Sequence, residues 1–152
     1  MSVTTINARD LNRHIEAIDA QPRALMAMGR PVCPACQVLD AGLAMIADAR
    51  PDLPMYVVNL ETDDDWAARE TVLWPRDIRV SRSATPAMVL LQHGKVVARR
   101  QGAAPAHDID GWIAGHFGPA ATPLAQGITD AEKAVLDRTT DRRAQHIAVK
   151  ER

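Results

Sequence analysis

Cysteine is scarce in this chain: only two of its 152 residues are cysteines, which excludes a framework of several disulfide bridges. A chain of this length does not need such bridges, because it can bury ~70% of its unfolded surface in one domain. Neither sign of charge dominates, since 18 lysines and arginines oppose 19 aspartates and glutamates. We therefore expect no nucleic acid among the partners of this protein.

Long hydrophobic runs are also missing. No apolar stretch approaches the ~20 residues that cross a membrane, and the start of the chain does not have the basic-then-apolar order of a signal peptide. We therefore expect no membrane partner and a cytoplasmic location. In that reducing compartment, two neighbouring cysteines are expected to be reactive or to bind a metal ion rather than to form a structural bridge.

The two cysteines lie together in Cys33-Pro34-Ala35-Cys36, directly after the apolar run 24–28. The run predicts a strand, and the cysteines then begin a predicted helix whose apolar positions recur at helical spacing. Cys33 is thus expected at a helix N-terminus, where free N–H groups and the helix dipole favour a thiolate. Such an arrangement is typical of a redox centre; the alternative is a pair of packed core thiols.

A metal site would use the same two cysteines. A tetrahedral zinc ion needs four ligands, so two histidines would have to join them, and none of the histidines has the spacing of a ligand pair. The five candidates are His14, His93, His107, His116 and His146. We therefore expect neither a metal ion nor another cofactor.

The rest of the chain predicts alternating helices and strands, followed by a hairpin with its turn at His93-Gly94 and a last helix. The expected helices are a first one from an Asn7 cap to about Gln21, one that the cysteines begin and that ends near Arg50, one from 63–65 to about Trp74, and one from about Asp108 to Phe117. The expected strands cover 24–28, 53–60, 86–92 and 95–101. This pattern predicts an α/β fold with a mixed central sheet flanked by helices.

The end of the chain has a different composition. Residues 119–123 are typical of a linker, and Thr129 with Glu132 matches a capping box, which predicts a helix from about Asp130. We therefore expect one domain over residues 1–118 and a linker with a helical appendage over residues 119–152.

This order of elements resembles the thioredoxin superfamily over roughly residues 4–118. The resemblance is carried by the cysteine motif between the first expected strand and its helix, by Thr85-Pro86 ahead of the hairpin, and by Gly102 after it. It implies a thioredoxin-like fold in which the Thr85–Pro86 peptide is cis and faces the disulfide.

The resemblance also implies an activity, that of a thiol–disulfide oxidoreductase in cell redox homeostasis. Cys33, outside the helix body, is the expected nucleophile, and Cys36, one turn into the helix and more buried, is the expected resolving residue. Thr85 and Pro86, together with Pro34 and Ala35, are expected to contact the substrate, which is a protein or small-molecule disulfide. The sequence does not predict the electron donor.

Several residues of the family are replaced here. Thioredoxins have Trp before the first cysteine, a buried Asp and a nearby Lys, and these positions fall on Val32, Ala27 and about Val57. The Cys-Pro-x-Cys motif is more like that of glutaredoxins, yet no Gly-Gly pair follows the strand after Pro86. We therefore assign no subfamily and keep a second hypothesis, a binding or assembly module of the same fold whose cysteines are regulatory or incidental.

Overall fold

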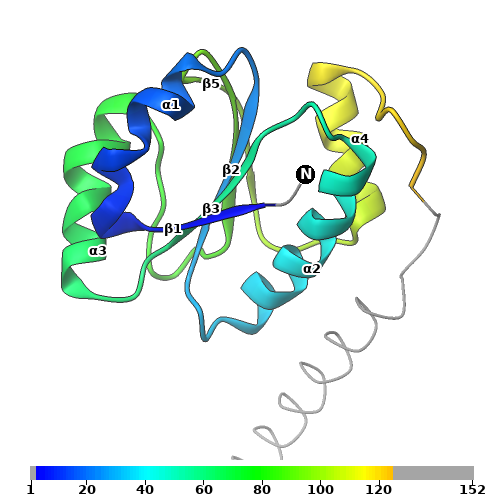
Figure 1. Cartoon of the computed structure of the whole chain (residues 1–152). Helices are drawn as coiled ribbons and strands as arrows, with labels where there is room; N and C mark the ends of the chain where they lie inside the picture. The colour runs from blue at the N-terminus through cyan, green and yellow to red at the C-terminus, as the bar shows by residue number, and fades with distance from the viewer. Residues whose placement is uncertain (1–2, 125–152) are drawn as a thin grey trace, which may run out of the picture.

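The computed structural model describes residues 3–124, which fold around one five-stranded mixed sheet (Figure 1). The strands are β1 (Thr4–Asn7), β2 (Ala24–Gly29), β3 (Met55–Asn59), β4 (Ala87–Gln92) and β5 (Lys95–Gln101). They lie in the order β1-β3-β2-β4-β5. β1 and β2 run parallel to β3, whereas β4 runs antiparallel to both β2 and β5. The expected mixed sheet is confirmed.

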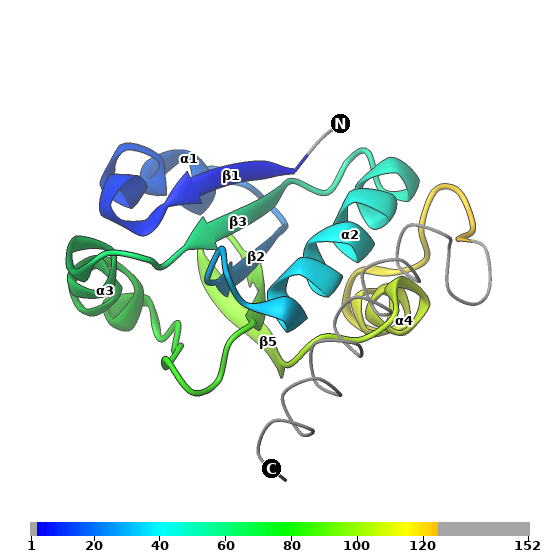
Figure 2. The ribbon, with the colours of Figure 1, turned by 90° about the horizontal axis from the view of Figure 1, so that it is seen from below.

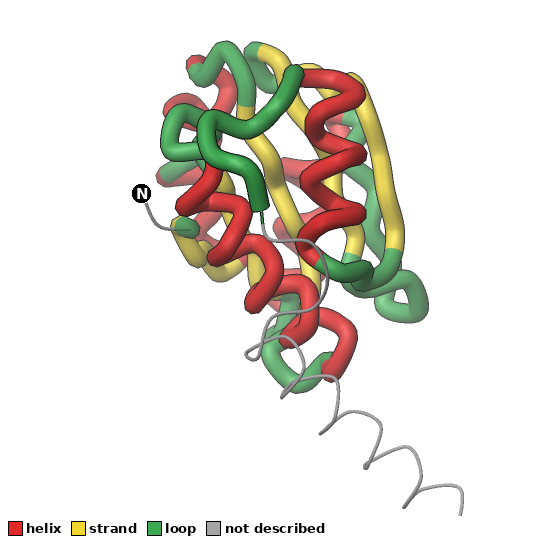
Figure 3. The backbone as a smooth tube through the Cα atoms, turned by 90° about the vertical axis from the view of Figure 1, so that its right-hand side faces the viewer, coloured by secondary structure: helices red, strands yellow, loops and turns green. Residues whose placement is uncertain are grey.

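Helices cover both faces of this sheet (Figure 2). The α-helices are α1 (Ile15–Ala20), α2 (Pro34–Ala49), α3 (Asp63–Ala68) and α4 (Ala106–Phe117). Helices α2 and α4 cover one face and lie in front of the strands in Figure 3, while α1 and α3 cover the other face. No helix within residues 3–124 has the length and apolar character of a membrane span.

The central strand β2 is buried over its whole length, which explains its continuous apolar sequence. Because successive side chains of a strand point to opposite faces, Met26 and Met28 join the core under α1 and α3. Leu25 and Ala27 join the core under α2 and α4, where Leu39 is also buried. Full burial of a side chain such as Leu or Met contributes about 1.5–3 kcal/mol to stability. The two cores together therefore fix the position of β2, which leads into the cysteine motif.

The first element of the chain differs from the sequence prediction. We expected a helix from an Asn7 cap, but Thr4–Asn7 is an edge strand, the Asn7 side chain makes no capping hydrogen bond, and a 3-10 helix, η1 (Ala8–Arg13), precedes α1. The strand was missed because only Ile6 among its four residues is buried, which leaves no alternating pattern to detect. Pairing with β3 determines its conformation.

The long connection between the cysteines and Pro86 contains the expected helix in three parts. Thr62 caps α3 through a capping box with Asp65, as its position before the acidic run suggests. The chain then continues as a π-helical turn, η2 (Arg69–Leu73), and a 3-10 turn, η3 (Trp74–Arg76). The last helix, α4, begins at Ala106, slightly earlier than expected.

Residues 119–124 contain no helix or strand, and the Thr122 N–H donates to the Ala49 carbonyl over 3.3 Å. The helix that Thr129 and Glu132 predict lies outside the described residues. The division of the chain at residue 118 therefore stays a prediction.

Candidate functional site

The two cysteines lie where β2 ends and α2 begins. Cys33 is the N-cap of α2 and has an extended backbone, and its Sγ accepts the N–H of Cys36 over 3.2 Å. Pro34 occupies the first helical position, where its missing N–H costs nothing. The motif thus begins the helix as the sequence predicted, and it brings the Cα atoms of Cys33 and Cys36 to 5.1 Å, with the two sulfurs joined in a disulfide.

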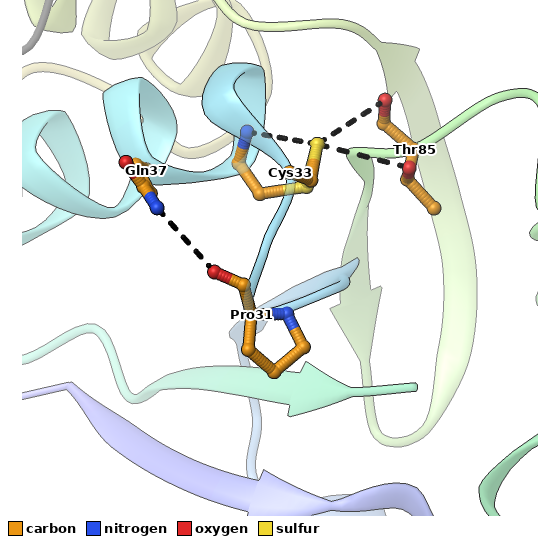
Figure 4. The surroundings of a disulfide bond; sticks show 5 residues. Pro31, Cys33, Gln37 and Thr85 are labelled. Carbon is orange, nitrogen blue, oxygen red and sulfur yellow. Dashed lines mark hydrogen bonds between the residues drawn. A yellow bond between two sulfur atoms is a disulfide. The ribbon is translucent and has the colours of Figure 1, made fainter. Parts of the chain in front are cut away.

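Local hydrogen bonds fix the turn between β2 and α2, and Figure 4 shows the one from Gln37 to Pro31. The Cys33 N–H donates to the Arg30 carbonyl over 3.2 Å, and Gln37 Nε2 donates to the Pro31 carbonyl over 3.4 Å. The position of the first sulfur is therefore set by the loop on one side and by the helix on the other.

The Thr85–Pro86 peptide is cis, as the family resemblance implied, and it faces the first sulfur. Cys33 Sγ lies 3.8 Å from Thr85 Oγ1 and 4.0 Å from the Thr85 carbonyl oxygen (Figure 4). On the other side of the peptide, the Pro86 carbonyl accepts the N–H of Gly102 over 2.8 Å. Gly102 has φ +82°, a conformation that glycine adopts without strain. Residues some fifty positions apart in the sequence thus meet at one site.

The site has a buried floor and an accessible rim. Cys33 is 5% exposed and Cys36 is 4% exposed. Cys36 was expected to be the more buried of the two, and the observed difference is very small. Val32, beside them, is 78% exposed. Pro34, Ala35 and Thr85 are half-buried, and Pro86 is buried. The four residues expected to contact substrate therefore gather around Cys33, although Pro86 contributes mainly to the floor.

Gly29, the last residue of β2, lies directly against the second sulfur. A Cβ atom placed on Gly29 would lie only 2.7 Å from Cys36 Sγ, closer than real Cβ contacts allow. Glycine is therefore needed here for space, and φ plays no part. The sequence analysis missed this residue, for which the signal was a glycine at the end of the predicted strand, shortly before the motif.

Among the groups near the site, one carboxyl has an altered proton affinity. Burial raises the pKa of Asp40, which lies on α2 one turn beyond Cys36. Ala27 and Val57, which occupy the positions of the family's Asp and Lys, are 2% and 7% exposed and bring no ionisable group. Sequence analysis also missed Asp40, because the family pattern places its acid on the strand.

Within residues 3–124, no three His, Cys, Asp or Glu side chains gather as they would around a metal ion. Four of the five histidines considered for a zinc site fall in this range, and His146 lies outside it. The described residues therefore do not form the zinc site that was considered.

Comparison with known proteins identifies the architecture. No protein-family model and no curated protein matches the sequence. The structure is similar to thioredoxin f2 from Chlamydomonas reinhardtii, with a TM-score of 0.60 and 16% identity over 78% of this chain and 99% of that chain. It is also similar to oxidised thioredoxin O2 from Arabidopsis thaliana, with a TM-score of 0.59 and 12% identity over 77% of this chain and 97% of that chain. At these identities the likeness establishes the fold, which is thioredoxin-like, as expected.

Proposed function

We propose that this chain, which has a thioredoxin-like fold, is a thiol–disulfide oxidoreductase that works through the Cys33–Cys36 couple. One observation carries the proposal: Cys33 caps helix α2 while its sulfur faces Thr85 of the cis peptide. A sulfur so placed has hydrogen-bond donors for a thiolate and lies beside exposed Val32, where a client can approach, and disulfide exchange needs both.

The reduced protein has three sources of stabilisation for a Cys33 thiolate. The Cys36 N–H and the Thr85 hydroxyl lie within hydrogen-bonding range of the sulfur, and the dipole of α2 favours negative charge at this end. No buried acid or lysine on β2 or β3 assists them, because Ala27 and Val57 stand there. The helix terminus and Thr85 therefore supply the activation.

The two cysteines are almost equally exposed, so exposure does not show which of them attacks the client. We assign the attack to Cys33 because of its neighbours. Cys33 lies beside exposed Val32 and half-buried Thr85, whereas Cys36 lies against Gly29 on the inner side. The Cys33 thiolate attacks one client sulfur and the other leaves as a thiolate. Cys36 then attacks Cys33 Sγ, and the remaining client sulfur leaves with its electron pair. The client gains two electrons and the cysteine pair becomes a disulfide.

We propose that the clients are protein or small-molecule disulfides. One similar structure is a complex of ferredoxin:thioredoxin reductase with thioredoxin f2, whose matched chain has a TM-score of 0.59 and 16% identity over 75% of this chain and 94% of that chain. This likeness favours protein partners. A role in cell redox homeostasis and a cytoplasmic location fit a chain whose only two cysteines form the reactive pair.

The decisive experiment is catalysed reduction of insulin disulfides by dithiothreitol, followed by turbidity. The wild-type chain should accelerate the reaction, and Cys33→Ser should not. A wild-type chain that binds clients but gives no acceleration would favour the alternative, a binding module. The midpoint potential of the couple in a glutathione buffer then gives the direction of transfer, because about 30 mV corresponds to about 1.4 kcal/mol.

A further inference from the structure

A small cavity lies behind the second sulfur. Its volume is about 10 Å³, close to the least that holds one water molecule. The ends of β2 and β3, the first turns of α2 and Pro86 line it, and its lining includes Ala27, Cys36, Asp40 and Val57. Cys36 thus lines a space of about the smallest size that holds one water, and Asp40 is the only carboxyl in its lining.

A wider groove of about 570 Å³ opens on the other side of Asp40, between β1 and α2. Asp40, Val57 and Asn59 line both the groove and the small cavity. Asp40 therefore stands between the sulfur and the solvent, with one side toward each. Asp40 as a whole residue is exposed, but this position lets its neighbours shield the carboxyl partly from water.

The surroundings of Asp40 contain few other charges. Arg30 lines the cavity, from the loop after β2, and Asp48 lines the groove, two turns further along α2. The lining residues from β1, β2, β3 and the cis peptide are uncharged. Burial is the cause that raises the pKa of Asp40, which brings its proton affinity nearer to that of a thiol.

We infer that Asp40 accepts the proton of the Cys36 thiol when the mixed disulfide is resolved. Cys36 and Asp40 are four residues apart on one face of α2 and share the cavity, so one water can connect them. This inference rests on the proposed function. The carboxyl comes from the helix, whereas the family's buried Asp would come from the strand position that Ala27 occupies.

The Asp40 carboxylate takes the thiol proton, and the Cys36 thiolate attacks Cys33 Sγ of the mixed disulfide. The bond between Cys33 and the client sulfur breaks, and the client leaves as a thiolate with the electron pair. Asp40 then passes its proton to water in the groove. Asp40 acts on the reacting sulfur through the cavity and makes no contact with the client.

The test is a stopped-flow reaction of the fully reduced chain with dithiobis(nitrobenzoate). The attack of Cys33 releases one coloured thiolate, and resolution by Cys36 releases a second. Asp40→Asn should leave the first release unchanged and slow the second by about tenfold or more at neutral pH, since positioned general bases contribute ~10²–10⁴-fold. The matched control is Asp48→Asn, which removes the same charge from the same helix outside the cavity and should change neither release.

The pH dependence separates proton transfer from a structural effect. The second release in the wild type should slow as pH falls through the pKa of Asp40, because a protonated carboxyl cannot accept a proton. In Asp40→Asn it should instead rise in proportion to hydroxide, and Asp40→Glu should restore part of the wild-type profile. A second release with wild-type rate and pH profile in Asp40→Asn would overturn the inference, as would equal slowing by Asp48→Asn. Absence of the first release in the wild type would contradict the proposed function itself.

Discussion

Ala27 on β2 and Val57 on β3 are register partners in the sheet, and both line the cavity behind Cys36. The two positions at which thioredoxins have a buried Asp and a Lys are therefore neighbours here and are both apolar. This pair of side chains therefore brings no ionisable group to the space behind Cys36. The chemistry of the pair depends instead on the start of α2, on Thr85 and, as we infer, on Asp40.

The roles of the two sulfurs can be separated by trapping. We expect Cys36→Ser to accumulate mixed disulfides with client proteins, because Cys33 attacks and no thiol then resolves the adduct. Cys33→Ser should trap little, since Cys36 lies against Gly29 on the inner side. Non-reducing gels of protein captured from a disulfide-containing mixture measure the difference. Equal trapping by both variants would show that the assignment of roles is wrong.

Gly29→Ala tests the close approach at the second sulfur. The new methyl group must displace Cys36 or the end of β2, so we expect a loss of about 1–3 kcal/mol in the free energy of unfolding of the oxidised protein. Gly115→Ala in α4 is the control, because nothing lies within 4 Å of its Cβ position and alanine favours a helix. Urea unfolding measures both. If Gly29→Ala kept the wild-type free energy of unfolding and Cys36 still resolved the mixed disulfide at the normal rate, the site would have room for the methyl group.

Asp65 at the start of α3 should make the protein sensitive to acid. It is fully buried and accepts the N–H groups of Arg9, Glu61 and Thr62 over 2.8, 3.0 and 3.0 Å. Burial alone would raise its pKa, but these hydrogen bonds outweigh it and hold the pKa below the usual value. A lowered pKa in the folded state means that the stabilisation is complete above the unfolded value of about 3.9 and is lost as pH falls through the folded value.

We therefore expect Asp65→Ala to cost about 2–4 kcal/mol at neutral pH, because three backbone donors lose their acceptor. The cost should begin to shrink as pH falls below about 4, where the unfolded carboxyl takes up a proton, and should shrink further until pH passes the lower pKa of the folded carboxyl. Asp64→Ala, exposed in the same helical turn, should cost only a few tenths of a kcal/mol, about the size of a surface interaction with the helix dipole. Urea denaturation over a pH series would measure both. Equal costs would contradict the role of Asp65.

The chain should be a poor substrate for a conventional thioredoxin reductase. The Trp, Asp and Lys of thioredoxins are replaced by Val32, Ala27 and Val57, which changes both the contact surface and the proton transfer. We expect NADPH consumption slower by about tenfold or more than with an ordinary thioredoxin, since acid–base groups contribute ~10²–10⁴-fold. Comparable turnover would show that these three residues are dispensable here.

Strong local signals made much of the fold predictable. Cys33 with Pro34 indicated the start of α2, the acidic run 63–65 indicated the start of α3, and His93-Gly94 indicated the hairpin turn. Strand β1 gave no such signal, because its conformation depends on pairing with β3, far along the chain. Gly29 was missed because its contact with Cys36 arises only when β2 and α2 pack together, and Asp40 was missed because the family pattern places the acid on the strand.

The two outer strands of the sheet, β1 and β5, are poorly suited to pairing with a further strand. β5 alternates exposed and half-buried residues, carries Lys95, Arg99 and Arg100, and pairs with β4 across an irregularity at Leu90/Leu91. At the opposite edge, β1 is only four residues long. Charged side chains, irregular pairing and short length all hinder the addition of another strand. If the proposed function holds, a client chain bound at Cys33 would thus find neither edge of the sheet suited to strand addition.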